Sequence, residues 1–132
     1  MSKMQDRFKF NAWDKKHKKM YYEVQNGLYA LSFSDLLEND NFEIIQSTGL
    51  KDKNGKLIYE GVIVKTNYGD VGVIKYSTHF CRWQIIFKQG REHLLAYKEI
   101  GVHVFDFIYP KMHLEIIGNI YENPELLETK NE

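Results

Sequence analysis

Five histidines and a single cysteine are the residues of this chain that could bind a metal ion or act as a nucleophile. His79 and Cys81 lie two residues apart, and His93, His103 and His113 follow at ten-residue intervals. Zinc sites are usually built from two close ligand pairs, and here only one such pair exists. The spacing therefore favours packed or hydrogen-bonded histidines, and we expect no metal and no other cofactor.

Catalysis by the Cys81 thiolate would require His79 on the same face of a strand and a group that stabilises an oxyanion. The sequence contains no glycine-rich nucleophile elbow and no phosphate-binding loop. A pair of catalytic carboxylates cannot be singled out among the 18 acidic residues. We expect a protein that is not an enzyme.

Basic residues next to aromatic residues offer a different chemistry, which is binding of single-stranded nucleic acid. In small β-barrels, bases stack on exposed rings while lysines and arginines contact the phosphates. Two clusters fit this pattern, and together they comprise Trp13, Lys15, Lys16, Lys18, Lys19, Arg82, Trp83 and Arg91. The alternative is that the tryptophans belong to a core or an interface and that the lysines form a solvated turn.

The overall charge favours that alternative. Lysine and arginine number 18, aspartate and glutamate also number 18, and the sequence pI is about 7.0. A phosphate footprint is therefore limited to a few contacts, while repulsion between copies of the chain is small. Because aromatic residues make up 14% of so short a chain, more aromatic surface is present than one small core hides. We predict a homo-oligomer that acts through protein contacts, with nucleic-acid binding as the second possibility.

The single cysteine, the absence of a signal peptide pattern and the absence of a long apolar run predict a cytoplasmic protein without a membrane segment.

Short alternating segments separated by turn residues indicate antiparallel strands. A β-hairpin is expected over 7–24 with a charged turn at 14–18, and tight turns are expected at 52–55, 67–70 and 88–91. Ser34 is expected to cap one helical turn through Leu36 and Leu37. The remaining strands are expected at 28–33, 42–46, 56–60, 62–66, 71–76, 83–87, 94–97, 102–109 and 114–121.

These elements predict a mainly β protein, all-β or α+β with little helix. An amino-terminal β-hairpin region, 1–41, precedes a small β-barrel of SH3-like size, 42–132, and together they form one compact unit. A short C-terminal helix is expected at 123–128, where Asn123 would be the N-cap and Pro124 the first helical residue.

Three segments carry a resemblance to the YopX family of phage and prophage proteins. They read RFKFNAWD at 7–14, TGLKDKNGKLIYEG at 48–61 and EIIGNIYENPELL at 115–127, so the resemblance spans nearly the whole chain. The family usually continues the second segment with Gly-Asp-Ile-Val, whereas this chain has Val62 after Gly61. The resemblance implies a small, mainly β, self-associating phage accessory protein in a bacterial cell, whose partners include itself and host or phage proteins. It implies no reaction.

Residues in these segments also have structural explanations. Asn54 and Gly55 suit a tight turn, Gly61 suits a bulge or a close backbone approach, and Gly118 suits a bend or tight packing within a strand. We expect turn, cap and packing roles for Asn54, Gly55, Gly61, Gly118, Asn123 and Pro124.

Overall fold

The computed structural model describes residues 3–79, 81–88, 102–103 and 114–128, and it confirms a mainly β protein with little helix. Contacts between residues divide the chain into two compact units, Met1–Leu50 and Lys51–Glu132, each of which is described by itself below. The predicted division after residue 41 falls at the start of a strand of the first unit and stays a prediction. No helix among the described residues is long and apolar enough to cross a membrane.

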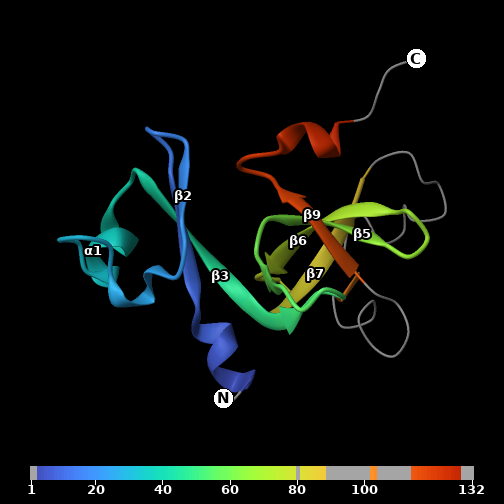
Figure 1. The fold of residues 1–132 in the computed structure, drawn as a ribbon, viewed down its shortest axis with the longest axis horizontal. Coiled ribbons are helices and arrows are strands. Elements are labelled where there is room, and N and C mark those ends of the chain that lie inside the picture. Colours follow the sequence, from blue (N-terminus) through green and yellow to red (C-terminus); the bar gives the residue numbers. More distant parts are fainter. Residues whose placement is uncertain (1–2, 80, 89–101, 104–113, 129–132) are drawn as a thin grey trace. The chain divides into compact units, whose positions relative to one another are not determined.

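The first unit contains a hairpin, as predicted for 7–24. Its strands β1 and β2 pair antiparallel, with Ala12 opposite Tyr21, and β1 also pairs with β3, with Ala12 opposite Ile44. The predicted strand begins later than Arg7 because the residues before it form a 3₁₀-helix. The elements are η1 (Lys3–Phe8), β1 (Phe10–Asp14), β2 (Lys19–Tyr21), η2 (Val24–Asn26), α1 (Phe33–Glu38) and β3 (Phe42–Lys51), shown in blue to green in Figure 1.

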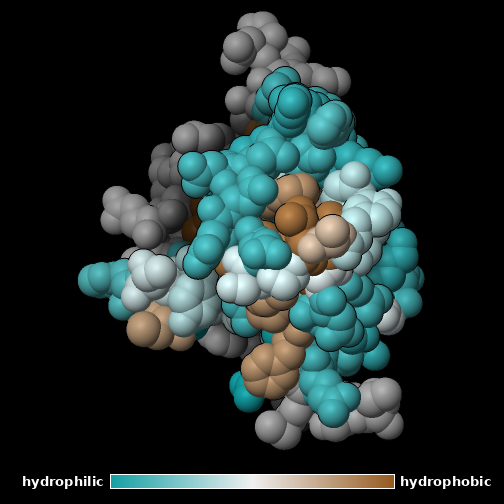
Figure 2. Space-filling model, turned by 90° about the vertical axis from the view of Figure 1, so that its left-hand side faces the viewer, coloured by the Kyte–Doolittle hydropathy of each residue, from teal (hydrophilic) through white to brown (hydrophobic). Residues whose placement is uncertain are grey.

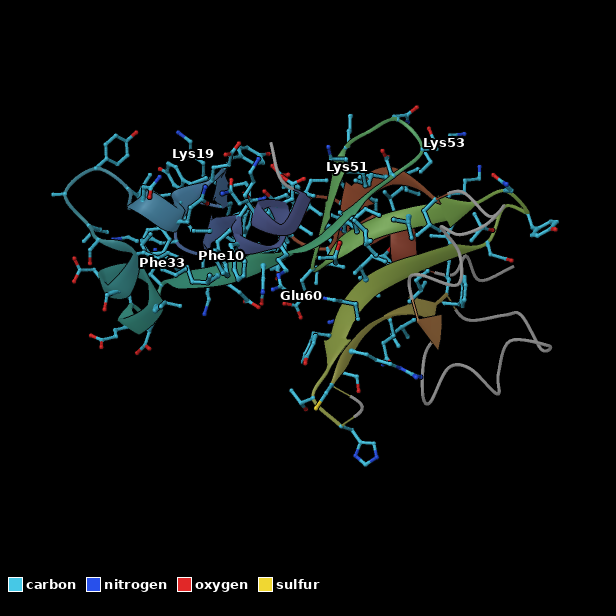
Figure 3. All side chains as sticks on the ribbon, turned by 90° about the horizontal axis from the view of Figure 1, so that it is seen from below. Phe10, Lys19, Phe33, Lys51, Lys53 and Glu60 are labelled. Carbon is cyan, nitrogen blue, oxygen red and sulfur yellow. The ribbon has the colours of Figure 1, made fainter. Side chains whose placement is uncertain are left out.

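One hydrophobic core cluster of the first unit lies on one face of this sheet, while Trp13, Met20 and Ile45 are buried on the opposite face. Ala12, Val24 and Leu36 are buried in this cluster, and the rings of Phe10 and Phe33 pack beside them with centroids 4.9 Å apart (Figure 3). Alternation along β1 places Phe10 and Ala12 on the same face, as the sequence predicts.

Helix α1 has only six residues, so it depends on its cap and on packing rather than on intrinsic propensity. The cap is Ser32, not the predicted Ser34. The Ser32 hydroxyl accepts from the Asp35 N–H at 3.0 Å, and the Asp35 carboxylate accepts from the Ser32 N–H at 2.8 Å. A cap at Ser34 would have no acidic residue three positions later, since that position holds Leu37.

The strand predicted at 28–33 is absent, and the prediction was wrong. The backbone reverses in a tight bridge in which Leu28 and Leu31 exchange two hydrogen bonds of 2.8 and 2.9 Å. Gly27 permits this reversal because its φ is +102° and a Cβ atom there would lie 2.7 Å from the Leu31 carbonyl oxygen. The apolar pattern arises because Leu28, Leu31 and Phe33 all pack against the core of the unit.

The second unit is a strongly curled antiparallel sheet with the order β8-β7-β6-β5-β9 (Figure 1), found where the small barrel was predicted. The strands expected at 62–66, 71–76 and 83–87 are confirmed, and the last strand ends at Asn119. The strand expected at 94–97, the turn at 88–91 beyond Lys88, and all but the first two residues of 102–109 lie outside the described residues. The elements are β4 (Leu57–Tyr59), β5 (Val62–Thr66), β6 (Val71–Ser77), β7 (Arg82–Phe87), β8 (Val102–His103), β9 (Leu114–Asn119) and η4 (Pro124–Leu127).

Apolar side chains are buried on both faces of this sheet, and Ile63 lies opposite Val73 on one of them. Ile74 lies opposite Ile85 and Val64 lies opposite Gly72, and all three apolar side chains are fully buried. Between β5 and β9 the register shifts, because Ile63 pairs with Gly118 while Val64 pairs with Ile116. Ile117 is therefore the extra residue of a β-bulge in β9.

Candidate functional site

The basic turn, Lys15–Lys19, connects β1 to β2 and is organised by the buried carboxylate of Asp14. One carboxylate oxygen of Asp14 accepts from the His17 N–H at 3.0 Å and from Asn41 Nδ2 at 2.8 Å, and the other lies 2.9 Å from His17 Nδ1. Asn41 also fixes the backbone of the turn, because its side-chain oxygen accepts from the Lys16 N–H. The basic turn thus has a fixed backbone while its lysine side chains are exposed.

These hydrogen bonds favour the ionised form of Asp14. The His17 backbone N–H contributes most, followed by the Asn41 amide, and the pKa of Asp14 falls from 3.8 to about 2. Because the folded-state pKa lies below the unfolded value, Asp14 contributes stability above pH 3.8 that is lost as the pH falls towards 2.

We therefore expect Asp14→Asn to lower the urea midpoint of the first unit near neutral pH, with a difference from wild type that shrinks between pH 4 and pH 2. A Trp83→Phe background leaves Trp13 as the tryptophan whose fluorescence reports the first unit. Asp40→Asn, an exposed carboxylate of the same unit, is the control. A difference that stays constant with pH contradicts the role of Asp14.

Next to the basic turn is a pair of tyrosines, of which Tyr29 is exposed while Tyr21 is half-buried and packs against the core of the first unit. Lys19 Nζ lies 5.1 Å from the centroid of the Tyr21 ring, and the Tyr21 ring meets the Tyr29 ring edge to face at 6.4 Å. Tyr29 is 90% exposed, with Tyr22 exposed nearby in sequence. We call Lys19, Tyr21 and Tyr29 the tyrosine surface. Figure 2 views the side of the first unit that carries α1 and shows an apolar area enclosed by hydrophilic residues.

Tyr29 is held in its position by the backbone. It occupies the Leu28–Leu31 bridge with a φ of +54°, a left-handed conformation that tyrosine adopts rarely. Such strain persists only where the surrounding structure imposes it, and here the two hydrogen bonds of the bridge do so. The sequence pattern missed this residue because it placed Tyr29 within a regular strand.

The structure places the predicted nucleic-acid residues in two groups. In the first unit, Lys15, Lys16, Lys18 and Lys19 are exposed, whereas Trp13 is only 7% exposed and offers no ring face to a base. The exposed tyrosine rings of this unit are those of Tyr22 and Tyr29, while Tyr21 is half-buried.

The second group lies on β7 of the second unit. Trp83 is half-buried, and its ring meets that of Tyr76 edge to face at 5.1 Å, while Arg82 stands opposite Ser77. Arg91 lies outside the described residues. Each group is described within its own unit.

The residues considered for metal or thiol chemistry are dispersed where they are described. Cys81 and His79 are exposed in the turn between β6 and β7, and Cys81 Sγ donates to the Thr78 carbonyl oxygen at 3.6 Å. His103 pairs with Gln84 in the backbone register, and His93 and His113 lie outside the described residues. Among the residues with described positions, no three histidine, cysteine, aspartate or glutamate side chains gather as metal ligands would.

Sequence reasoning missed the buried carboxylate of Asp52 in the second unit, which accepts three backbone hydrogen bonds. This residue is 6% exposed; one of its oxygens accepts from the N–H groups of Asn54 and Lys56, both at 2.9 Å, and the other accepts from the Ile116 N–H at 3.0 Å. An Asp two residues before Asn-Gly signals the local turn, in which Gly55 has a φ of +83°. Nothing in the local pattern signals the bond to Ile116.

The hydrogen bond between Asp52 and Ile116 covers the outer edge of strand β9. Strand β9 ends the described sheet, and its outward Ile116 N–H and Leu114 carbonyl are both satisfied, by Asp52 and by the Lys53 N–H. An edge whose polar groups are already bonded does not add a strand from another chain.

The end of β9 is closed in a similar way by Asn123. Asn123 stands at the N-cap position of η4, as predicted, but its side-chain oxygen accepts from the Asn119 N–H at 3.1 Å and makes no capping hydrogen bond to η4. Gly118 makes room for it, because a Cβ atom there would lie 2.7 Å from the Asn123 side-chain oxygen. Pro124 begins η4 as predicted. Gly61 has a φ of +85° beside the ring of Tyr121.

Two solved structures are similar in fold to this chain. Protein EF1440 from Enterococcus faecalis is 25% identical, with a TM-score of 0.61 over 91% of this chain and 97% of that chain. Protein yopX from Bacillus subtilis is 22% identical, with a TM-score of 0.56 over 95% of this chain and 99% of that chain. No match was found among curated proteins. The sequence model of the YopX protein family matches residues 9–128, and the chain belongs to this family.

Proposed function

We propose that this protein is a non-enzymatic interaction module that self-associates through its tyrosine surface. The observation that carries the proposal is Tyr29, whose side chain is 90% exposed on a backbone locked in a left-handed conformation. Left-handed backbone costs a residue with a Cβ about 1 kcal/mol or more, while the exposed Tyr29 ring has a single ring contact, its edge-to-face contact with Tyr21, among the described residues. Rigid, exposed tyrosines are the side chains that anchor protein interfaces.

Two further features favour association of copies through side chains rather than through addition of a strand to a sheet edge. The β9 edge is closed by Asp52 and Asn123, and the β2 edge of the first unit is only three residues long and carries Lys19. The formal charge of zero keeps repulsion between copies small.

The biological setting belongs to the same proposal. The family resemblance supports an accessory role for a phage or prophage in the cytoplasm of a bacterial host, with host or phage proteins as additional partners.

The test compares Tyr29→Ser with wild type by sedimentation velocity. We expect the wild-type mass to rise between about 1 and 100 μM, the range of a modest protein interface, and Tyr29→Ser to weaken association about tenfold or more. Tyr68→Ser is the matched control, because Tyr68 is 74% exposed in the 67–70 turn of the second unit. A wild-type protein that stays monomeric throughout, or an equal loss in Tyr68→Ser, contradicts the proposal.

A second candidate function is binding of single-stranded nucleic acid, favoured by the cation–π contact between Lys19 and Tyr21 beside the exposed ring of Tyr29. Neutralisation of the lysines of the basic turn separates the two functions. Oligonucleotide affinity that falls steeply with salt and is lost when Lys15, Lys16, Lys18 and Lys19 are neutralised supports nucleic acid, whereas absence of binding at low salt excludes it.

A further inference from the structure

We propose that the tyrosine surface and the basic turn of one copy bind the acidic turn of a second copy, which we define as Glu122, Pro124, Glu125 and Glu128. This inference rests on the proposed self-association and names the two surfaces that meet. The contact joins two different patches, and each copy carries both of them.

The receiving side is cationic and aromatic. Lys16 and Lys18 are exposed, and neither forms an ion pair with another described residue. They lie in the turn whose backbone Asp14 and Asn41 hold, next to the Lys19 ammonium group above Tyr21. A partner for this surface must therefore bring carboxylates, together with an apolar group for the ring of Tyr29.

The acidic turn has both features in a fixed geometry. Glu122 is exposed, and its carboxylate accepts from Asn119 Nδ2 at 2.8 Å. The Asn119 side-chain oxygen accepts from the N–H groups of Tyr121 and Glu122, which holds the backbone before η4. Pro124 is exposed beyond this turn, with Glu125 and Glu128 exposed beside it in sequence.

The chemistry of the two patches is complementary. A proline ring packs against a tyrosine face with little loss of conformational entropy, as proline-rich ligands do in aromatic grooves. The flanking carboxylates would then face lysine ammonium groups that no described carboxylate neutralises. Because both backbones are already held by hydrogen bonds, little ordering accompanies binding.

Contact between unlike patches has a geometric consequence. A heterologous interface leaves one free patch of each kind on every pair, so further copies add until a ring closes or a filament grows. The association should also weaken as the salt concentration rises, because the lysines and glutamates are exposed.

The experiment uses two variants of the full chain, each of which is altered in one patch. Lys16→Ser/Lys18→Ser/Tyr29→Ser removes two lysines and the exposed ring of the receiving side, and Glu125→Gln/Glu128→Gln removes two of the three carboxylates of the acidic turn without touching the Glu122 hydrogen bond. Each variant alone should be monomeric where the wild type associates. Mixed in equal amounts, they should form a 1:1 dimer and nothing larger, because one intact patch of each kind remains.

Controls separate this inference from the proposed function. Glu38→Gln/Asp40→Asn removes two exposed carboxylates of the first unit and should associate as the wild type does. If the wild type associates and Glu125→Gln/Glu128→Gln associates equally well, the tyrosine surface pairs with something else and this inference is wrong while self-association stands. If the wild type itself stays monomeric, the proposed function fails.

Discussion

Asp52→Asn is expected to lower the free energy of unfolding of the second unit by about 2 to 3 kcal/mol, since a buried hydrogen-bond donor loses its acceptor. In one orientation, the new amide group faces the Ile116 N–H, which then has a donor opposite it at 3.0 Å. In the other orientation, the amide faces the N–H groups of Asn54 and Lys56. Because Asp52 is 6% exposed, water does not replace the lost acceptor.

Urea unfolding in a Trp13→Phe background measures this loss, because Trp83 then reports the second unit. Glu115→Gln is the matched control: Glu115 is a half-exposed carboxylate whose oxygen lies 3.7 Å from Lys53 Nζ, and a surface pair of this kind contributes less than about 1 kcal/mol. Equal shifts in the two variants would show that burial of Asp52 has no energetic consequence.

Gly72→Ala is expected to destabilise the second unit by about 2 kcal/mol or more, because the paired strand leaves no space for a methyl group. A Cβ atom at Gly72 would lie 2.7 Å from Ile85 Cγ2 and 2.9 Å from the Ile86 carbonyl oxygen. Ile85 is fully buried, and the Ile86 backbone belongs to the β6–β7 ladder. Neither atom can withdraw without opening the sheet or the core.

The control for Gly72 is Gly69→Ala, which isolates the backbone contribution. Gly69 has a φ of +87° with open space around the position of a Cβ atom, so the loss expected is about 1 kcal/mol, from conformation alone. Comparable losses for both variants, measured by urea unfolding through Trp83, would mean that the contacts at Gly72 relax.

Local signals in the sequence were sufficient for much of the fold. The Asn54–Gly55 turn, the reversal at Gly69 and the charged turn between β1 and β2 are each encoded within a few residues, and the structure contains all three. Alternation of apolar and polar residues then predicted the strands on either side of these turns.

Features that depend on distant residues could not be predicted. Leu28 and Leu31 resembled part of a strand because both are apolar. In the structure the chain reverses between them, and each packs against the core from its own side of the reversal. Because a regular strand was predicted at 28–33, the exposed position of Tyr29 was not predicted either. The burial of Trp13 and the bond from Asp52 to Ile116 are properties of the folded chain, which no window of sequence contains.

In the candidate site, the basic turn could be predicted from the sequence, whereas the position of Tyr29 could not. The run Lys15–Lys19 is evident from composition, and Tyr21 lies close to it in sequence. Its contact with Tyr29 depends on the left-handed bridge, which only the structure shows.

The bond between Asp52 and Ile116 spans 64 residues, and this distance along the chain bears on the order of folding. Its two ends meet only after β5, β6 and β7 have formed their neighbouring pairs and β9 has joined β5, since closure of so long a loop is costly before those contacts exist. We infer that the bond is absent from the folding transition state. It therefore acts mainly on the unfolding rate, so that the carboxylate of Asp52 determines how long the second unit stays folded more than how fast it folds.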